Sequence, residues 1–180
     1  FCLEILTQDD GKNMIYYTFL NYGEGSLEPA KEMMEHPNTI LGLGDGGAHC
    51  GSICDGSFTT HMLTHWVRDR SRGEKLSLPW VIKAHCQDTA HAVGLNDRGI
   101  IAIGYKADIN VIDLKNMKLH KPEVHYDLPA GGRRLMQYAD GYVATIVSGE
   151  IIYHNGEATG ARPGRLVRGS QLAPNEESLQ

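Results

Sequence analysis

A short apolar run that stops at an aspartate, inside a cluster of glycines, is the feature that most constrains this chain. Residues 39–49 read TILGLGDGGAH, so residues 39–43 have the length of a buried parallel strand and Asp45 follows them. Enzymes of the α/β class keep catalytic groups where strands end, and glycines permit sharp turns and the close approach of a ligand. The segment therefore suggests a metal-binding, proton-handling role for Asp45. The alternative is an aspartate that hydrogen-bonds to its own turn.

Up to about residue 95 the pattern alternates between strand and helix, which implies βα units and a parallel sheet. The expected strands cover residues 3–6, 15–19 and 39–43. The expected helices follow Ser26, Ser57 and Ser77, whose hydroxyls can cap free backbone N–H groups. In the third helix Cys86 shares the apolar face with Leu78, Val81, Ile82 and Val93 and is expected in the core.

From about Gly99 onward the sequence is rich in β-forming residues. Residues 100–114 predict two strands about a Gly-Tyr turn, residues 142–147 and 151–154 predict a hairpin, and Asn155-Gly156 signals another turn. A strand-only region needs a covering layer, so we expect this chain to be part of a larger architecture. We expect three regions: residues 1–95 form part of a barrel, residues 96–169 form a β-rich part, and residues 170–180 form a polar tail.

Composition narrows the classes of partner. The chain has 180 residues and a net charge of −5 with dispersed basic residues, so nucleic acid is not an expected partner. Its apolar runs are too short to span a bilayer, so no membrane is expected either. Four irregularly spaced cysteines favour a reducing compartment, and we expect a cytoplasmic location. The chain begins at Phe1, which leads us to expect that the true start lies upstream.

Two further motifs have a functional and a structural interpretation. Gly42-x-Gly44-x-x-Gly47 resembles a dinucleotide fingerprint, but the residues that follow do not begin a helix, so nucleotide binding is not favoured. A second motif consists of a cysteine pair followed by a histidine pair, a spacing that suits a structural zinc site. The loop between the two pairs is shorter than in zinc fingers, and the two histidines lie on the polar face of a predicted helix. We therefore favour a solvent-exposed helix face over a zinc site. The residues of this motif are Cys50, Cys54, His61 and His65.

Residues 131–134 read GGRR and offer a third candidate site. Backbone N–H groups of such a segment can bind an anion. We favour a surface loop that ends a strand.

Three stretches carry a resemblance to a known family. They read GDGGAH with SFTTHMLTHWVRDR, then LNDRGIIAIGYKADINVIDL, then LPAGGRRLMQYADGYVATIVSGEIIYHNGEATGARPGRLVRG. From about Thr39 to Gly169 the chain resembles the C-terminal portion of the N-acyl-D-amino-acid deacylases (D-aminoacylases) of the amidohydrolase superfamily.

The resemblance implies a zinc-dependent TIM barrel with a small β-sandwich built from both chain ends. It implies hydrolysis of an N-acyl amide, a small-molecule substrate, with Asp45 as metal ligand and general acid/base. We take the adjacent Gly46, Gly47 and His49 as candidate substrate-binding residues. Two features depart from the family: the residues contain no His-x-His motif, and no arginine or lysine lies between Asp45 and Phe58.

The sequence therefore predicts an α/β fold: the last βα units of a TIM barrel, followed by the C-terminal strands of a sandwich. We expect zinc in the full-length enzyme, and we expect the missing N-terminal part of its own chain to complete the fold. We also expect homo-oligomers, and no activity from these 180 residues alone. The alternative is a non-catalytic, self-associating module derived from the same fold.

Overall fold

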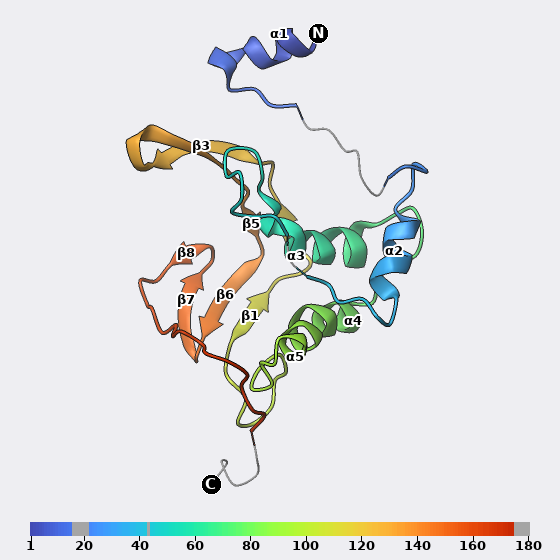
Figure 1. Cartoon of the computed structure of the whole chain (residues 1–180), viewed down its shortest axis with the longest axis vertical. Helices are drawn as coiled ribbons and strands as arrows, with labels where there is room; N and C mark the ends of the chain where they lie inside the picture. Colours follow the sequence, from blue (N-terminus) through green and yellow to red (C-terminus); the bar gives the residue numbers. More distant parts are fainter. Residues whose placement is uncertain (16–21, 43, 175–180) are drawn as a thin grey trace. The chain divides into compact units, whose positions relative to one another are not determined.

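The computed structural model describes residues 1–15, 22–42 and 44–174. The chain divides into two compact units, Phe1–Thr39 and Ile40–Gln180 (Figure 1). Most of the strand expected at residues 15–19 lies outside the described residues, as does Leu43. Among the described residues, no helix is long and apolar enough to cross a membrane.

The first unit is helical. Helix α1 spans Cys2–Thr7, a 3₁₀ turn covers Asp9–Gly11, and α2 spans Glu28–Glu35. The strand expected at residues 3–6 is wrong, because four residues are too few to separate the two periodicities and Leu-Glu-Ile-Leu also suits a helix. In α1 the Thr7 hydroxyl donates to the Leu3 carbonyl at 2.8 Å.

The prediction for α2 is confirmed. The Ser26 hydroxyl accepts from the Glu28 N–H at 3.2 Å, and the helix ends before Pro37, whose ring disfavours a helical residue in front of it. Lys31 and Glu35 pair across one turn at 2.7 Å.

Two helical segments form much of the core of the second unit. The first runs through a 3₁₀ turn (Asp55–Ser57), α3 (Phe58–His61) and a π-helix, η3 (Met62–Asp69). The second runs through α4 (Leu78–Lys83), a π-helix, η4 (Ala84–Asp88), and α5 (Thr89–Ala92). Their buried apolar residues are Met62, Leu63, Trp66, Val81, Ala84 and Ala90.

Two of the predictions for these helices need correction. The cap at Ser77 is confirmed, since its hydroxyl accepts from the Trp80 N–H, but Ser57 makes no cap hydrogen bond. Cys86 is exposed rather than in the core, and Ile82 and Val93 are 40% and 68% exposed. For Cys86 and Val93 the reason is that residues 84–88 are π-helical, and a wider turn rotates these side chains away from the face that a 3.6-residue period predicts.

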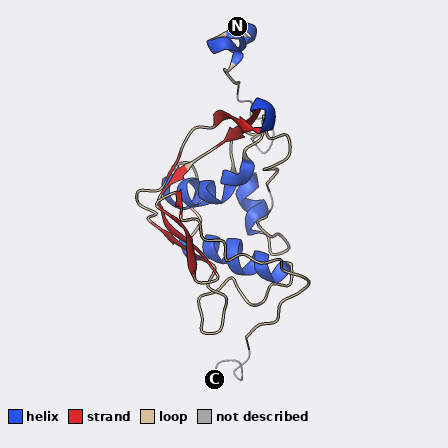
Figure 2. Ribbon diagram, turned by 90° about the vertical axis from the view of Figure 1, so that its left-hand side faces the viewer, coloured by secondary structure: helices blue, strands red, loops and turns tan. Residues whose placement is uncertain are grey.

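The β-rich part of the second unit contains a four-stranded antiparallel sheet in the order β1-β6-β7-β8. Its strands are β1 (Ile109–Ile112), β6 (Tyr142–Val147), β7 (Glu150–His154) and β8 (Glu157–Ala158). The sheet lies to one side of the helices of this unit (Figure 2). The predicted β6–β7 hairpin is confirmed, and Asn155 and Gly156, both at positive φ, form the predicted turn into β8.

Two strand pairs complete the β structure. Strand β2 (Lys118–Leu119) pairs with β5 (Ala139–Asp140), and β3 (Glu123–Leu128) pairs with β4 (Gly132–Met136) through a 3₁₀ turn at Pro129–Gly131. Both pairs are antiparallel.

The mixed helix and strand content agrees with an α/β amidohydrolase fragment, but the parallel sheet is not found among the described residues. Residues 39–42 form no strand. Within the described residues the one parallel pairing is an isolated bridge between Leu95 and Gln171. The first strand expected around the Gly-Tyr turn is also wrong: Ile101 and Ile103 are 89% and 84% exposed and lie in a loop. The TIM barrel, the sandwich and the boundary at residue 95 remain predictions.

Candidate functional site

Asp45 lies in an exposed loop, residues 44–57, which we call the Asp45 loop. Backbone hydrogen bonds fold its first half into consecutive turns. The Ala48 N–H donates to the Asp45 carbonyl at 3.2 Å, and the Ser52 N–H donates to the His49 carbonyl at 2.8 Å. The Asp45 carboxylate itself makes no hydrogen bond or ion pair with the described residues. The turn is therefore held by the backbone and leaves the carboxylate available to a ligand.

The two glycines beside Asp45 are needed for packing. A Cβ on Gly44 would lie 3.1 Å from the Asp55 Cβ, and a Cβ on Gly46 would lie 3.0 Å from the Gly56 nitrogen. Both distances are tighter than most Cβ contacts, so a side chain there would force its neighbours to shift, and without one the backbone on either side of Asp45 packs closely on the 3₁₀ turn that precedes α3. This packing fixes the backbone at Asp45 although residues 39–42 form no strand.

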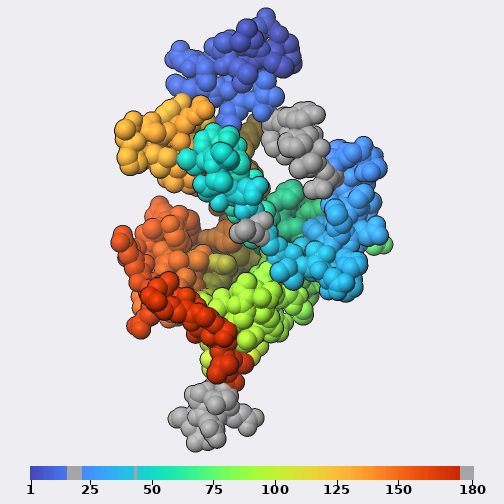
Figure 3. Space-filling model, viewed as in Figure 1, coloured from blue at the N-terminus to red at the C-terminus, as the bar shows by residue number. Residues whose placement is uncertain are grey.

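The Asp45 loop is attached to strand β4, which lies about 80 residues further along the chain. The Leu135 N–H donates to the Cys50 carbonyl at 2.6 Å, and the Cys50 thiol lies 3.9 Å from the Arg133 carbonyl. At the other end of the loop the Ser57 hydroxyl donates to Gln137 Oε1 at 2.6 Å. Figure 3 shows the loop in cyan beside the β3–β4 hairpin in yellow-orange.

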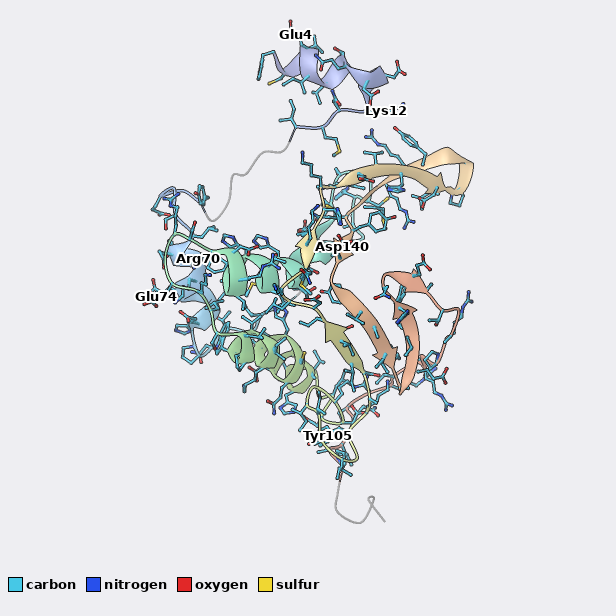
Figure 4. All side chains as sticks on the ribbon, turned by 180° about the vertical axis from the view of Figure 1, so that it is seen from behind. Glu4, Lys12, Arg70, Glu74, Tyr105 and Asp140 are labelled. Atoms are coloured by element: carbon cyan, nitrogen blue, oxygen red, sulfur yellow. The ribbon has the colours of Figure 1, made fainter. Side chains whose placement is uncertain are left out.

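Gln137 connects this loop to the β-rich part. Its Oε1 accepts from Ser57 and lies 3.8 Å from the Cys54 thiol, while its Nε2 donates to the His120 carbonyl at 2.7 Å. The His120 ring in turn bonds Asp140 at 2.8 Å, at the position of Asp140 labelled in Figure 4. The sequence gives no signal for Gln137, because its partners are distant in the chain and bear no motif.

The zinc-spaced quartet does not form a site among the described residues. The Cys50 thiol lies against Arg133 of β4, whereas the Cys54 thiol lies against Gln137, which follows that strand. No group of three or more His, Cys, Asp or Glu side chains suited to a metal occurs in the described ranges. The rings of His61 and His65 stack at 5.0 Å on one helix face. Burial, and then the neighbouring His65, lower the pKa of His61, while burial and then Arg70 lower the pKa of His65.

The GGRR segment begins a strand, so the prediction of a loop that ends one is wrong. Gly132 opens β4, and Arg134 forms two hydrogen bonds with Asp127 across the hairpin, at 2.7 and 2.6 Å. The hydrogen bond from Arg134 lowers the pKa of Asp127. Arg133 points away from this pair: an ideal Cβ on Gly51 of the Asp45 loop would meet its Nε at 3.3 Å.

The structure thus places Asp45, Gly46, Gly47 and His49 in one exposed loop. Gly47 and His49 both have a positive φ in this loop. The described residues bring no second metal ligand to Asp45. They do bring Arg133 and Gln137 to the same loop, and neither was predicted for this site from the sequence.

Comparison with known proteins identifies the family. A family model described as the amidohydrolase family matches residues 12–153, which are 142 of the 180 residues. A search of curated proteins and a search of solved structures gave no match. The matched region contains the whole Asp45 loop, the two helical segments and the strands that hold the loop. The chain therefore belongs to the amidohydrolase family, a family of hydrolases.

Proposed function

We propose that this chain is the C-terminal part of a zinc-dependent amidohydrolase that hydrolyses N-acyl-D-amino acids or related amides. Asp45 serves there as metal ligand and general acid/base. The observation that supports this most is an exposed carboxylate without a protein partner among the described residues, fixed by two packed glycines in a chain of the amidohydrolase family. A structural aspartate would instead use its carboxylate within the turn.

Among the candidate site residues, the Asp45 carboxylate is the group whose chemistry suits a zinc ion. A carboxylate oxygen is an ordinary zinc ligand, and a catalytic zinc has about three protein ligands. The described residues contain no group of three such side chains, so we propose that the remaining ligands come from other segments of the protein. When bound, zinc would supply Lewis-acid polarisation of the amide carbonyl.

The residues of this chain handle the proton. Asp45 takes a proton from water as the water oxygen forms a bond to the amide carbon, and it delivers that proton to the nitrogen as the C–N bond breaks. The products are a carboxylic acid and a free amine. Gly46, Gly47 and His49 lie along the same turns, so we propose that they contact the substrate.

We expect the full-length protein to hydrolyse N-acetyl amino acids in a way that a chelator abolishes and zinc restores. The 180 residues alone should show no turnover, because Asp45 by itself cannot form a three-ligand zinc centre. Amine release from a panel of N-acetyl-D- and L-amino acids measures both. Chelator-sensitive turnover by the isolated chain would contradict the proposal, as would full-length activity that is indifferent to chelator.

A second candidate function is a non-catalytic, self-associating module. The observation that favours it is a set of strongly exposed apolar side chains in the second unit, which are Ile101, Ile103, Leu166 and Leu172. Apolar side chains gathered on a surface mark association sites. The zinc test above decides between the two functions, because a module would show no metal-dependent turnover in any length of protein.

Both functions predict that the isolated chain self-associates. The exposed apolar side chains and the edge strands β1 and β8 can be covered by a second copy. Sedimentation velocity at micromolar concentration should show a dimer or larger species that dissociates on dilution. A single species of 19.8 kDa at every concentration would show that the chain covers its own apolar surface.

The location of the protein is also a proposal. All four cysteines are free in the structure, which agrees with a reducing compartment, and we propose the cytoplasm.

A further inference from the structure

His61 and His65 lie one turn apart on the same face of the first helical segment. His61 is the last residue of α3, and His65 follows four positions later in η3. Their ring centroids are 5.0 Å apart, and their ring planes differ by 6°. Among the described residues the two rings contact each other and the ring of Trp66, and no hydrogen bond or ion pair reaches a nitrogen of either ring. Two imidazoles without a polar protein partner in that part of the chain therefore lie side by side.

Both rings are accessible and in the form that binds metals. His61 is exposed, and the ring nitrogens of the half-buried His65 still reach solvent. Partial burial lowers the pKa of both imidazoles, and a neighbouring positive charge, His65 for His61 and Arg70 for His65, lowers it further, against a smaller opposing effect of Asp69 on His65. A neutral imidazole is the metal-binding form, so both rings are available as ligands at neutral pH.

The helix that carries the pair is held by the core. The residues between and directly after the two histidines are all buried, and they are Met62, Leu63, Thr64 and Trp66. The Thr64 hydroxyl donates to the Thr60 carbonyl at 3.0 Å, and the Thr60 hydroxyl lies 2.8 Å from the Tyr142 hydroxyl of β6. Ligands on a fixed helix lose little freedom when an ion binds, which favours binding.

The separation of the rings suits a shared ion. Two histidines four positions apart on a helix have the spacing with which metalloprotease helices hold zinc. A metal about 2.0–2.1 Å from one nitrogen of each ring, at a near-tetrahedral angle, places the two ring centroids about 5 Å apart. The observed separation is 5.0 Å. The ion must lie in the plane of each ring, so the rings have to turn about their Cβ–Cγ bonds, a torsion with a broad energy well.

The pair has the features of a binding site and lacks those of a catalytic one. In the metalloprotease pattern a glutamate, the general base, follows the first histidine, and this chain has the buried Met62 there. The described residues bring no third His, Cys, Asp or Glu side chain to the pair. Two protein ligands leave the other coordination positions of an ion to water.

We propose that His61 and His65 form a two-ligand site for a divalent transition-metal ion that prefers imidazole, such as Cu²⁺ or Zn²⁺. The site is separate from the zinc centre proposed at Asp45, because neither histidine is a ligand there. Its affinity should fall in the order Cu²⁺, Zn²⁺, Mn²⁺, which is the general order for nitrogen ligands.

Trp66 provides a built-in reporter for this site. Its ring contacts the ring of His65 edge-on, at 5.4 Å between centroids, so a Cu²⁺ ion bound by the pair should quench its fluorescence. In the full-length protein, freed of unbound metal, we expect saturable quenching by Cu²⁺ at pH 7.5 and little effect of Mn²⁺ at the same concentrations. In His61→Asn and in His65→Asn the midpoint of the copper titration should rise by roughly 10-fold or more, because loss of even a supporting residue costs a metal site about 10- to 100-fold in affinity.

His91→Asn is the matched control. His91 is an exposed histidine of α5 with no second histidine one turn away, so its loss should leave the copper titration unchanged. Circular dichroism of each variant checks that the fold is retained. The titration requires no turnover, so its outcome does not depend on whether the protein hydrolyses an amide.

Two results would overturn the inference. Quenching with the same midpoint in the wild type and in all three variants would mean an adventitious ion only, bound elsewhere on the surface. The absence of saturable quenching in the wild type would mean that the two rings stack on the helix and bind no metal.

Discussion

Asp45→Asn in the full-length protein is expected to lower kcat for amide hydrolysis by roughly 10²- to 10⁴-fold while the fold remains intact. Asparagine keeps the shape of the side chain, but it can neither take up a proton nor bind a metal as an anion. The backbone around it should be unaffected, because the turn is held by main-chain hydrogen bonds and by the packing of Gly44 and Gly46. Steady-state kinetics with circular dichroism of the same preparation measures both parts.

Asp55→Asn is the matched control for this variant. Asp55 is exposed in the same loop and its Cβ faces the backbone of Gly44, so the substitution keeps the contact and removes one charge. It should retain most of the activity. If Asp45→Asn kept more than about half of the wild-type turnover, Asp45 would be a turn residue and the proposed mechanism would be wrong.

The largest expected loss of stability comes from Gly141→Ala. Gly141 lies between β5 and β6 at φ +99°, and a Cβ there would lie 2.7 Å from the Met117 Cα and 2.9 Å from its Cβ. Met117 is 2% exposed, so neither backbone nor side chain can move aside easily. Backbone strain and overpacking together should lower the free energy of unfolding by about 2–6 kcal/mol.

Gly156→Ala separates the two causes of this loss. Gly156 is also at positive φ, +84°, but a Cβ there meets nothing within 4 Å. It should therefore cost only the conformational part, about 1–2 kcal/mol. Urea unfolding of the two variants and the wild type gives the comparison, and equal losses in both would mean that the tight contact with Met117 is absent in solution.

Sequence patterns predicted the local structure well where local forces decide it. The helix after Ser26, the cap at Ser77 and the β6–β7 hairpin each depend on neighbouring residues, and all three are found. The predictions fail where the structure depends on residues that are distant in the sequence. Residues 3–6, 39–42 and 100–103 suit a strand, but a strand needs a neighbour to take its hydrogen bonds, and the described residues provide none for these segments.

The candidate site was predictable in part for the same reason. Asp45 and its glycines form a contiguous motif, and the structure places them in one loop. Gln137 and Arg133 reach that loop from about 80 residues away, through contacts such as those with Ser57 and Gly51 that have no sequence signature. The exposure of Cys86 could not be predicted either, because the hydrophobic pattern does not reveal that residues 84–88 are π-helical rather than α-helical.

The most direct test of the central claim is anomalous X-ray diffraction at the zinc edge from crystals of the full-length protein. The proposed function predicts an anomalous peak about 2.0–2.2 Å from an Asp45 carboxylate oxygen, with the other ligands supplied from outside residues 44–57. A zinc peak bound elsewhere, with the Asp45 carboxylate turned into solvent in an active enzyme, would contradict it.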